Sequence, residues 1–512
     1  MSDIQEWKPS INPWIMIIPV ILAAFICILD TTIGNVALPH MAGAFSASRD
    51  ESMWILTSYL VAAGIIMPAV DWLSKIFGRK NYFVLSILLF TISSMLCGLS
   101  QNIEFMIFAR ILQGLGGGGL VPVANAIVWE SFSKEERGAA LSIFGMGVVI
   151  APIIGPVMGG WITDNWTWPW IFFINVPLGC LAAFLAHRLI VDPPYIKREK
   201  NIKIDWVGFL FLTIWLVTFQ IVLDKGNDAD WFNSTWVCWT FGISMLSCIA
   251  FFYSQFRNKD SLIDLRIFKD RNFTAGVTVQ VIAQAILYSS LAILPQFLQN
   301  MLGYTAYLSG LTIMTRGMGS VVALITTAKL SNKIDNRLFV GAGLLLIGIS
   351  GVMFGNLNQQ IAPESILIPN VLLGIGVGWA LVPIMSLTVM TLKNEQMTNA
   401  SAIQNLLKNV AGAIGTSLVS TLVTRYSQVH QYMLVGNLTP LNPNYTARIQ
   451  ELVAKFSYLP QQVAEQTANG LLYRELINQS TLFGYIDAFR IFGILAFFVI
   501  PFLLMIRVKK KA

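Results

Sequence analysis

Long apolar runs, separated by short polar segments, set the pattern of hydrophobic and polar positions along this chain. A helix that crosses the hydrocarbon core of a bilayer needs about 20 predominantly apolar residues, and each run is close to that length. The pattern predicts an all-helical integral membrane protein with about fourteen spanning segments. These are 13–38, 52–70, 82–100, 103–129, 138–162, 168–190, 205–224, 234–256, 272–298, 306–328, 337–356, 364–391, 398–425 and 485–507.

The composition favours the same class of protein. Hydrophobic residues make up 55% of the 512 residues and charged residues 12%, with a mean hydropathy of +0.64. A soluble domain carries about 25% charged residues, because its surface must be solvated. The first run, 13–38, lacks a small-residue cleavage site, which favours a retained first helix over a signal peptide.

The basic residues behind the net charge of +7 lie in short loops between the runs. With the N-terminus in the cytoplasm, they concentrate in alternate loops, and the opposite short loops contain only Arg49 and Lys225. The positive-inside rule then predicts that both termini are cytoplasmic. The cell inner (plasma) membrane is the expected location. No Lys/Arg-rich block lies beside stacking aromatic residues, so nucleic-acid binding is excluded.

The sequence offers no chemistry of the usual enzymatic kinds. Gly114-x-Gly116-x-x-Gly119 matches the dinucleotide fingerprint in its letters, but it lies within an apolar helix and not in a βαβ unit. Neither a cofactor nor a metal is therefore predicted, and energy must come from an ion gradient or from the substrate's own gradient. The cysteines lack CxxC or His-paired spacing, which also excludes disulfides. They are Cys27, Cys97, Cys180, Cys238 and Cys248.

An internal repeat relates the two ends of the chain. Residues 110–122 and 370–383 share a Gly-x-Gly pattern followed by Val-Pro, with the same membrane orientation. Two parallel six-helix bundles are the architecture of the major facilitator fold. We therefore expect bundles at 13–190 and 272–507, with an inserted helix pair at 205–256.

The connection 426–484, on the outer side, is far longer than any other. Loops of this length are usually functional or disordered. Its middle part, 445–480, mixes Gln, Ala, Leu and Glu at helical spacing. A docking element and a solvated flap both remain open.

Small residues recur every four positions along the segment 138–162 and make one smooth face for close helix contact. Two prolines beside that face interrupt the backbone hydrogen-bond ladder and favour a bend. We expect this face to act as a hinge or seal, although a well-packed helix pair would need the same small residues. The residues are Gly147, Ala151, Pro152, Gly155, Pro156 and Gly159.

Asp30 is the only acid deep inside a predicted helix, and Arg110 lies at a similar depth in another. At 1.5 Å per residue, both are roughly 10–14 Å below the outer surface. Burying a charge costs several kcal/mol unless it is paired or hydrated. An ion pair is therefore expected, with Asp30 carrying or gating a proton and Arg110 setting its affinity. The alternative is a pair that only fixes one helix against the other.

Arg316 and Lys408 are also predicted near mid-depth, without an acid of matching depth. Polar residues along the same helices predict a hydrated substrate cavity, although such residues can simply hold helices together. The predicted cavity residues are Gln113, Gln280, Gln284, Tyr288, Arg316, Asn405 and Lys408.

Several of these segments resemble motifs of known transporters. Residues 110–117 resemble the fourth-helix motif of major facilitator proteins, and 147–160 resemble a fifth-helix antiporter motif that is largely confined to exporters. Residues 29–39 and 170–179 are similar to the first and sixth helices of the fourteen-helix drug–proton antiporters. The long connection before 485–489 is similar to that of the EmrB-like subgroup.

The resemblance implies proton-coupled efflux of amphipathic or hydrophobic compounds by alternating access. It also implies a periplasmic membrane-fusion partner and an outer-membrane channel, besides lipid, protons and small-molecule substrates. The inner-loop motif departs from the family pattern, with Asp71 at its first position and Lys75 in place of the usual Asp. Gly78 and Arg79 match it, so Asp71, Gly78 and Arg79 are expected to form the inner-loop gate.

Three other functions stay open at this stage. A dedicated exporter of one anionic metabolite would use Arg316 and Lys408 as counter-ions. A channel would require pore-lining rings from symmetric subunits, and an embedded enzyme would require a cluster of His, Asp or Glu. The three histidines, His40, His187 and His430, are scattered along the chain.

Overall fold

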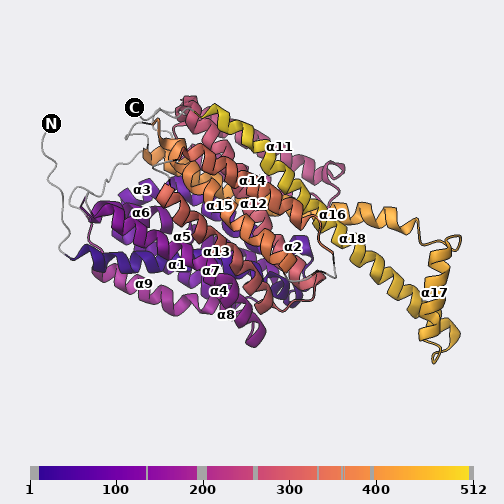
Figure 1. The fold of residues 1–512 in the computed structure, drawn as a ribbon. Coiled ribbons are helices and arrows are strands. Elements are labelled where there is room, and N and C mark those ends of the chain that lie inside the picture. The colour runs from indigo at the N-terminus through magenta and orange to yellow at the C-terminus, as the bar shows by residue number, and fades with distance from the viewer. Residues whose placement is uncertain are drawn as a thin grey trace, which may run out of the picture.

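The computed structural model describes residues 11–133, 136–192, 205–257, 263–330, 334–358, 361, 364–392 and 397–506. In this part of the chain, 14 helices are long and apolar enough to cross a membrane, which confirms the predicted helix count. They form one elongated bundle, from which a helical hairpin projects (Figure 1).

The principal helices begin and end close to the predicted positions. One predicted segment, 103–129, is divided into two helices at Gly118 and Gly119, and 168–190 is divided at Ile174. The helices are α1 (Pro13–Ala44), α2 (Arg49–Ile66), α3 (Val70–Phe77), α4 (Arg79–Gly98), α5 (Ile103–Gly117), α6 (Leu120–Ser131), α7 (Arg137–Asn165), α8 (Trp170–Phe173), α9 (Asn175–Leu189), α10 (Trp206–Lys225), α11 (Thr235–Arg257), α12 (Arg271–Gln296), α13 (Ala306–Leu330), α14 (Asn336–Phe354), α15 (Glu364–Val389), α16 (Met397–Val435), α17 (Pro443–Lys455) and α18 (Gln461–Val499).

Local sequence fixes several helix starts. Ser48 and Glu51 form a capping box at the start of α2, in which each side chain accepts a hydrogen bond from the other residue's backbone N–H. Asn12, Asn102 and Asp270 cap α1, α5 and α12 by accepting backbone N–H bonds. Each cap satisfies a donor that the helix itself leaves unpaired, which stabilises the start of the helix at that residue.

The long connection 426–484 is largely helical, in agreement with the helical spacing of its middle part. α16 and α18 have 39 residues each, and they extend past the bundle to α17 at their far end (Figure 1). At 1.5 Å per residue each helix is about 58 Å long, roughly twice the hydrocarbon thickness of a bilayer. Leu452 of α17 packs on Ala468 and Leu472 of α18 in a small separate core. We call residues 426–484 the hairpin, and the end of the bundle from which they project the hairpin end.

The outer faces of the bundle are apolar. Trp239, Leu246 and Ile249 of α11 are 71%, 69% and 66% exposed. In a soluble protein such a face would be an association site, whereas lipid covers it at no cost. The structure is therefore that of a multi-pass membrane protein.

Candidate functional site

Asp30 lies in a buried polar cluster between four helices. Its Oδ2 accepts a hydrogen bond from Arg110 Nη1 of α5 at 2.6 Å, which is also an ion pair. Its Oδ1 accepts from Gln113 Nε2 at 2.9 Å and from Asn175 Nδ2 of α9 at 2.8 Å. Asp30 and Arg110 are 2% and 1% exposed. The ion pair that was predicted from equal depth is thus present, and lies in a dry environment.

The guanidinium of Arg110 is held on several sides. Its Nε donates to the backbone oxygen of Ile55 at 2.9 Å, and its Nη1 to Gln113 Oε1 at 2.6 Å. The ring of Tyr59 lies 4.7 Å from the guanidinium carbon, within cation–π range. Breaking a buried ion pair by removing one partner costs about 3–5 kcal/mol, because the remaining charge is uncompensated. Removing either side chain would therefore leave the other charge buried without its partner.

Glycines of α5 allow this cluster to close. A Cβ on Gly114 would lie 2.8 Å from the Cβ of Ala62 and 3.1 Å from the backbone nitrogen of Ala63, both on α2. Side chains larger than hydrogen would force α5 away from α2 and remove Arg110 from the Ile55 carbonyl. The Gly-x-Gly pattern therefore works through helix approach, as expected.

The structure changes the predicted grouping of the site residues. Gln113, predicted to line the substrate cavity, is part of the Asp30 cluster, because both ends of its amide are used there. Asn175 and Tyr59 were not predicted to take part. The position of Asn175 in the sixth-helix motif was the signal available for it. Tyr59 had no such signal, because an aromatic residue in an apolar helix is usually a packing residue.

Arg316 of α13 is the least satisfied buried cation in the described residues. It is 5% exposed, and its Nε donates to Asn370 Oδ1 of α15 at 3.0 Å. Its Nη1 and Nη2 are buried without a hydrogen-bond partner in the described part of the chain. Asn370 occupies the repeat position of Arg110, so the second bundle has a neutral amide where the first has a cation. The predicted lack of a matching acid for Arg316 holds among these residues.

The other predicted cavity residues lie on α12 and α16. Gln280 and Gln284 are buried, and Tyr288, Asn405 and Lys408 are partly buried. Gly412 of α16 lies against the ring of Tyr288, since a Cβ there would be 2.9 Å from Tyr288 Cδ2. Lys408 lies one turn before Gly412 on the same helix. The polar faces of α12 and α16 therefore meet, and α12 also packs against α1, the helix that carries Asp30.

The small-residue face of α7 packs against α1. Cβ atoms on Gly147 and Gly159 would lie 2.6 Å and 3.0 Å from the side chains of Ile21 and Ile33, and Gly155 lies against Thr32. Ala151 is fully buried, while Pro152 and Pro156 lie within the helix. This face joins two helices of the predicted first bundle, so it is not itself the contact between the two predicted bundles.

A neighbouring face of α7 makes that contact, with α13. A Cβ on Gly160 would lie 2.7 Å from the Cα of Tyr307, and one on Gly317 would lie 3.2 Å from the Cα of Ile153. Asp164 of α7 accepts the backbone N–H groups of Ala306 and Tyr307 at 3.0 Å and 2.7 Å. The carboxylate thereby caps the start of α13, where the helix dipole favours a negative charge. The two predicted bundles are thus in direct contact at the hairpin end.

The inner-loop residues form a tight turn between α3 and α4. Gly78 has φ +83°, a conformation that favours glycine. Arg79 pairs with Glu130 at the end of α6. The side chain of Asp71 lies outside the described residues, as do residues 331–333 of the predicted repeat of this loop.

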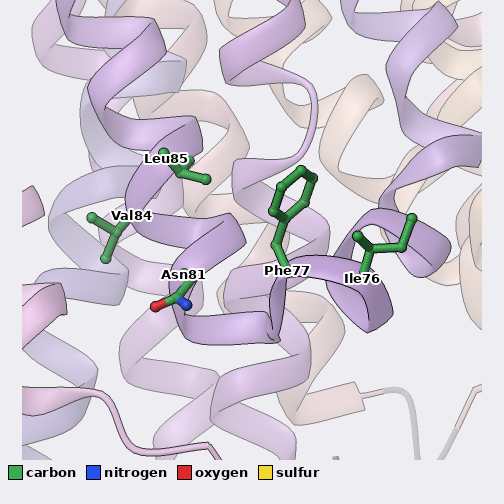
Figure 2. A pocket seen from close by; sticks show the side chains of 5 residues that line it. All are labelled: Ile76, Phe77, Asn81, Val84 and Leu85. Atoms are coloured by element: carbon green, nitrogen blue, oxygen red, sulfur yellow. The ribbon is translucent and has the colours of Figure 1, made fainter. Parts of the chain in front are cut away.

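A recess of about 400 Å³ lies beside this turn (Figure 2). It is lined by Ile76, Phe77, Asn81, Val84 and Leu85. Phe77 and Leu85 are 44% and 49% exposed, so the recess is open on the apolar outside of the bundle. None of the predicted site residues lines it, and we assign it no role in transport.

In the described residues, fourteen helices are long and apolar enough to span a membrane, and with the buried ion pair and the polar helix faces they are typical of a polytopic membrane transporter. The chain belongs to the Major Facilitator Superfamily, whose family model matches residues 20–416. Within it, the chain is similar to the multidrug export protein EmrB of Escherichia coli, with 30% identity over 95% of this chain and 94% of that one. It is also similar to the fatty acid resistance protein FarB of Neisseria gonorrhoeae, with 32% identity over 94% and 93%.

Solved structures show the same fold at low identity. A crystal structure of the peptide transporter POT superimposes with a TM-score of 0.64 at 13% identity, over 96% of this chain and 95% of that one. At this level of identity the likeness concerns the fold alone. The major facilitator fold, expected from the internal repeat, is thereby confirmed.

Proposed function

We propose that this protein is a secondary active transporter that exports amphipathic or hydrophobic compounds in exchange for protons. The observation that carries the proposal is the buried cluster around Asp30, a carboxylate held by Arg110, Gln113 and Asn175 within a membrane-spanning bundle. An exchanger needs a group that takes up a proton on one side and releases it on the other. A buried carboxylate beside a cation suits this, because burial and the cation act on its proton affinity in opposite directions.

Alternating access is assigned to the two bundles 13–190 and 272–507. The contact of α7 with α13 closes the hairpin end, and the prolines of α7 lie next to it. Opening would separate Asp164 from the start of α13 and shift α7 relative to α1. The turn at Gly78, with Arg79 and Asp71, is the corresponding gate at the opposite end.

We place the protein in the cell inner membrane, with both termini in the cytoplasm and the hairpin outside. The support is the distribution of basic residues between alternate loops. The hairpin would then lie in the periplasm, where it is long enough to leave the headgroup region.

The hairpin is the docking element for a periplasmic membrane-fusion protein that leads to an outer-membrane channel. Apolar residues are exposed on it beyond the membrane-spanning length: Tyr432 is 85% exposed, Leu441 93% and Tyr458 76%. Residues of this kind commonly mark protein interaction sites when they gather on one element.

Replacing residues 434–478 by a short Gly/Ser linker is expected to spare transport in vesicles but to abolish drug resistance in whole cells. The linker variant retains the part of the hairpin where α16 packs against α18. There Ser427 lies against Gly484, and His430 bonds to Asp487 at 2.6 Å. Resistance and vesicle transport are measured on the same variant. As a control, Arg448 and Glu451, which pair at 2.9 Å on α17, are exchanged. Equal loss in both assays would show that the hairpin is needed for folding instead.

A second candidate function is the export of an anionic amphiphile. The observation that favours it is Arg316, whose two terminal nitrogens are buried without a partner in the described residues. A buried guanidinium is stabilised by a carboxylate or another anion. A carboxylate substrate would supply this charge, with Lys408 as a second cation. The name of the Neisseria relative, which refers to fatty acid resistance, fits such a substrate.

Uptake into inside-out vesicles tests both candidates. We expect accumulation of a compound only when a pH gradient, acidic inside, is imposed, and collapse when a protonophore is added. A panel of one cationic, one neutral and one anionic amphiphile, the last a long-chain carboxylate with its methyl ester as control, decides between them. Uptake of the carboxylate alone would favour the anion exporter. Uptake of every compound at the same level with and without the pH gradient would rule out proton coupling.

A further inference from the structure

The C-terminal end of α10, the first helix of the inserted pair, lies between α2 and α16. Asp224, near its last residue, is 5% exposed. Its Oδ2 accepts a hydrogen bond from Thr57 Oγ1 of α2 at 2.9 Å, and its Oδ1 accepts from Ser417 Oγ of α16. Gln220, one turn earlier on α10, donates to the same Oδ1 at 2.9 Å. One carboxylate thus joins a helix of the first predicted bundle to a helix of the second.

Further contacts at the same place repeat this arrangement. Lys225 pairs with Glu51 of α2 at 3.3 Å, and Asn227 donates to Asp50 of α2 at 3.3 Å. On the other side, Asp230 pairs with Arg425 of α16 at 3.1 Å. Asp50 itself accepts from Ser420 of α16 at 2.5 Å. The end of α10 and the turn after it therefore hold both helices.

The bonds to Asp224 can be released without leaving the hydroxyl groups unpaired. Thr57 Oγ1 also lies 3.1 Å from the carbonyl oxygen of Met53, and Ser417 Oγ lies 3.1 Å from that of Ala413. A hydroxyl has one proton, so it donates either to Asp224 or to its own helix. Each helix can therefore leave Asp224 and return its donor to its own backbone, which makes the contact suitable for repeated opening.

The charges around Asp224 agree with this interpretation. Asp50, which bonds to Asn227 and Ser420 at the same place, is itself an acid and offers Asp224 no counter-charge. The nearby cations are engaged elsewhere, Lys225 with Glu51 and Asp228, and Arg425 with Asp230. In the described residues Asp224 is thus held by hydroxyl and amide donors and not by an ion pair. Such contacts are sensitive to the exact position of both helices, because the donors are short side chains.

We propose that the end of α10 is a latch that holds α2 and α16 together when the hairpin end is closed, with Asp224 as its buried centre. The inserted pair, α10 and α11, lies in the sequence between the two predicted bundles, and the latch gives it a role in the conformational cycle. The latch must open each time the transporter opens at the hairpin end. This inference rests on the alternating access proposed above.

Distances between spin labels test the latch directly. Labels are placed at Gln101, between α4 and α5, and at Ser365, in the first turn of α15; both are exposed at the hairpin end and belong to different predicted bundles. Cys180, Cys238 and Cys248 are replaced by Ser beforehand, because they are not buried. The reporter residues do not contact the latch. The measurement is made on the full chain in nanodiscs by double electron–electron resonance.

Thr57→Val and Ser417→Ala each remove one side of the bridge, and Asp224→Ala removes both. We expect each to raise the ratio of long to short distances about tenfold or more, the size that follows from losing a buried hydrogen bond to a charged group. Thr218→Val is the matched control, since Thr218 lies on α10 and donates to its own helix at Ile214, 2.6 Å away. It should leave the distances unchanged.

The result that would overturn the proposal is a wild-type distance distribution in both Thr57→Val and Ser417→Ala. These two variants are nearly isosteric, so a folding defect in Asp224→Ala alone would not hide the answer. The distances are read without a transported compound or a pH gradient. A failure of the latch can therefore be told apart from a failure of proton-coupled export, which the vesicle assay measures separately.

Discussion

Asp30→Asn is expected to abolish accumulation of substrate against a gradient. The exchange of labelled for unlabelled substrate across the membrane should remain. Asn keeps the size of Asp and one acceptor oxygen, but it does not titrate and carries no charge. Arg110 then loses its counter-ion at 2.6 Å, whereas the amides of Gln113 and Asn175 can still donate to the remaining oxygen, as both donate to Oδ1 of Asp30 in the unchanged protein. If Asp30 carries the proton, uphill uptake into inside-out vesicles should fall at least about a hundredfold, the range in which single general acid–base groups act.

Exchange assays distinguish a role of Asp30 in proton coupling from a purely structural role. Counterflow of labelled against unlabelled substrate needs no proton movement, so it should persist in Asp30→Asn if the cluster remains folded. Asp30→Glu is the matched variant, because it restores a titrating group one methylene away, and should recover part of the uphill transport. Normal accumulation by Asp30→Asn would show that the pair with Arg110 only fixes α1 against α5. Loss of both accumulation and counterflow in Asp30→Asn would also point to a structural role of the pair.

Gly160→Leu is expected to have the second large effect, a loss of export with normal insertion into the membrane. A Cβ at Gly160 would already lie 2.7 Å from the Cα of Tyr307, so a Leu side chain would have to separate α7 from α13. That separation would also pull Asp164 from the backbone N–H groups that it accepts at the start of α13. The hairpin end could no longer close, and we expect transport in vesicles to fall at least about tenfold, as a cost of one or two kcal/mol implies.

A glycine on the same helix provides the control. No atom lies within 4 Å of a Cβ built on Gly145, so Gly145→Leu should insert and transport like the unchanged protein. Gly155→Leu, on the face against α1, tests a different contact, because it would displace Thr32 within the first bundle. Export by Gly160→Leu at the level of Gly145→Leu would show that α7 and α13 do not need to meet.

The sequence predicted the elements of this protein well, and their lateral contacts less well. Helix positions depend on runs of about 20 apolar residues, a property that each segment carries by itself. The pairing of Asp30 with Arg110 followed from depth, since charged residues are rare enough in such runs to leave few partners. Depth gives no direction around the helix axis, however. For that reason Gln113 was assigned to the cavity, although it bonds to Asp30.

The same limit explains the change at α7. A four-residue spacing of small residues predicted a close contact, and the contact exists. Which neighbour fills it depends on how the helix is rotated in the bundle. The spaced face meets α1, and Gly160, one residue out of register, meets Tyr307 of α13.

What the sequence determined by itself was the number of membrane-spanning helices, the repeat that relates them and the few charges that must find partners. These depend on hydrophobic length and on the cost of burying charge, both of which act within one segment. Only the tertiary structure decided that α16 and α18 continue from the bundle into the hairpin, that Arg316 meets Asn370, and that Asp224 joins α2 to α16. Asp224 is at the end of a predicted segment, where a carboxylate is usually solvated. It is buried because α2 and α16, far apart in the sequence, pack over it.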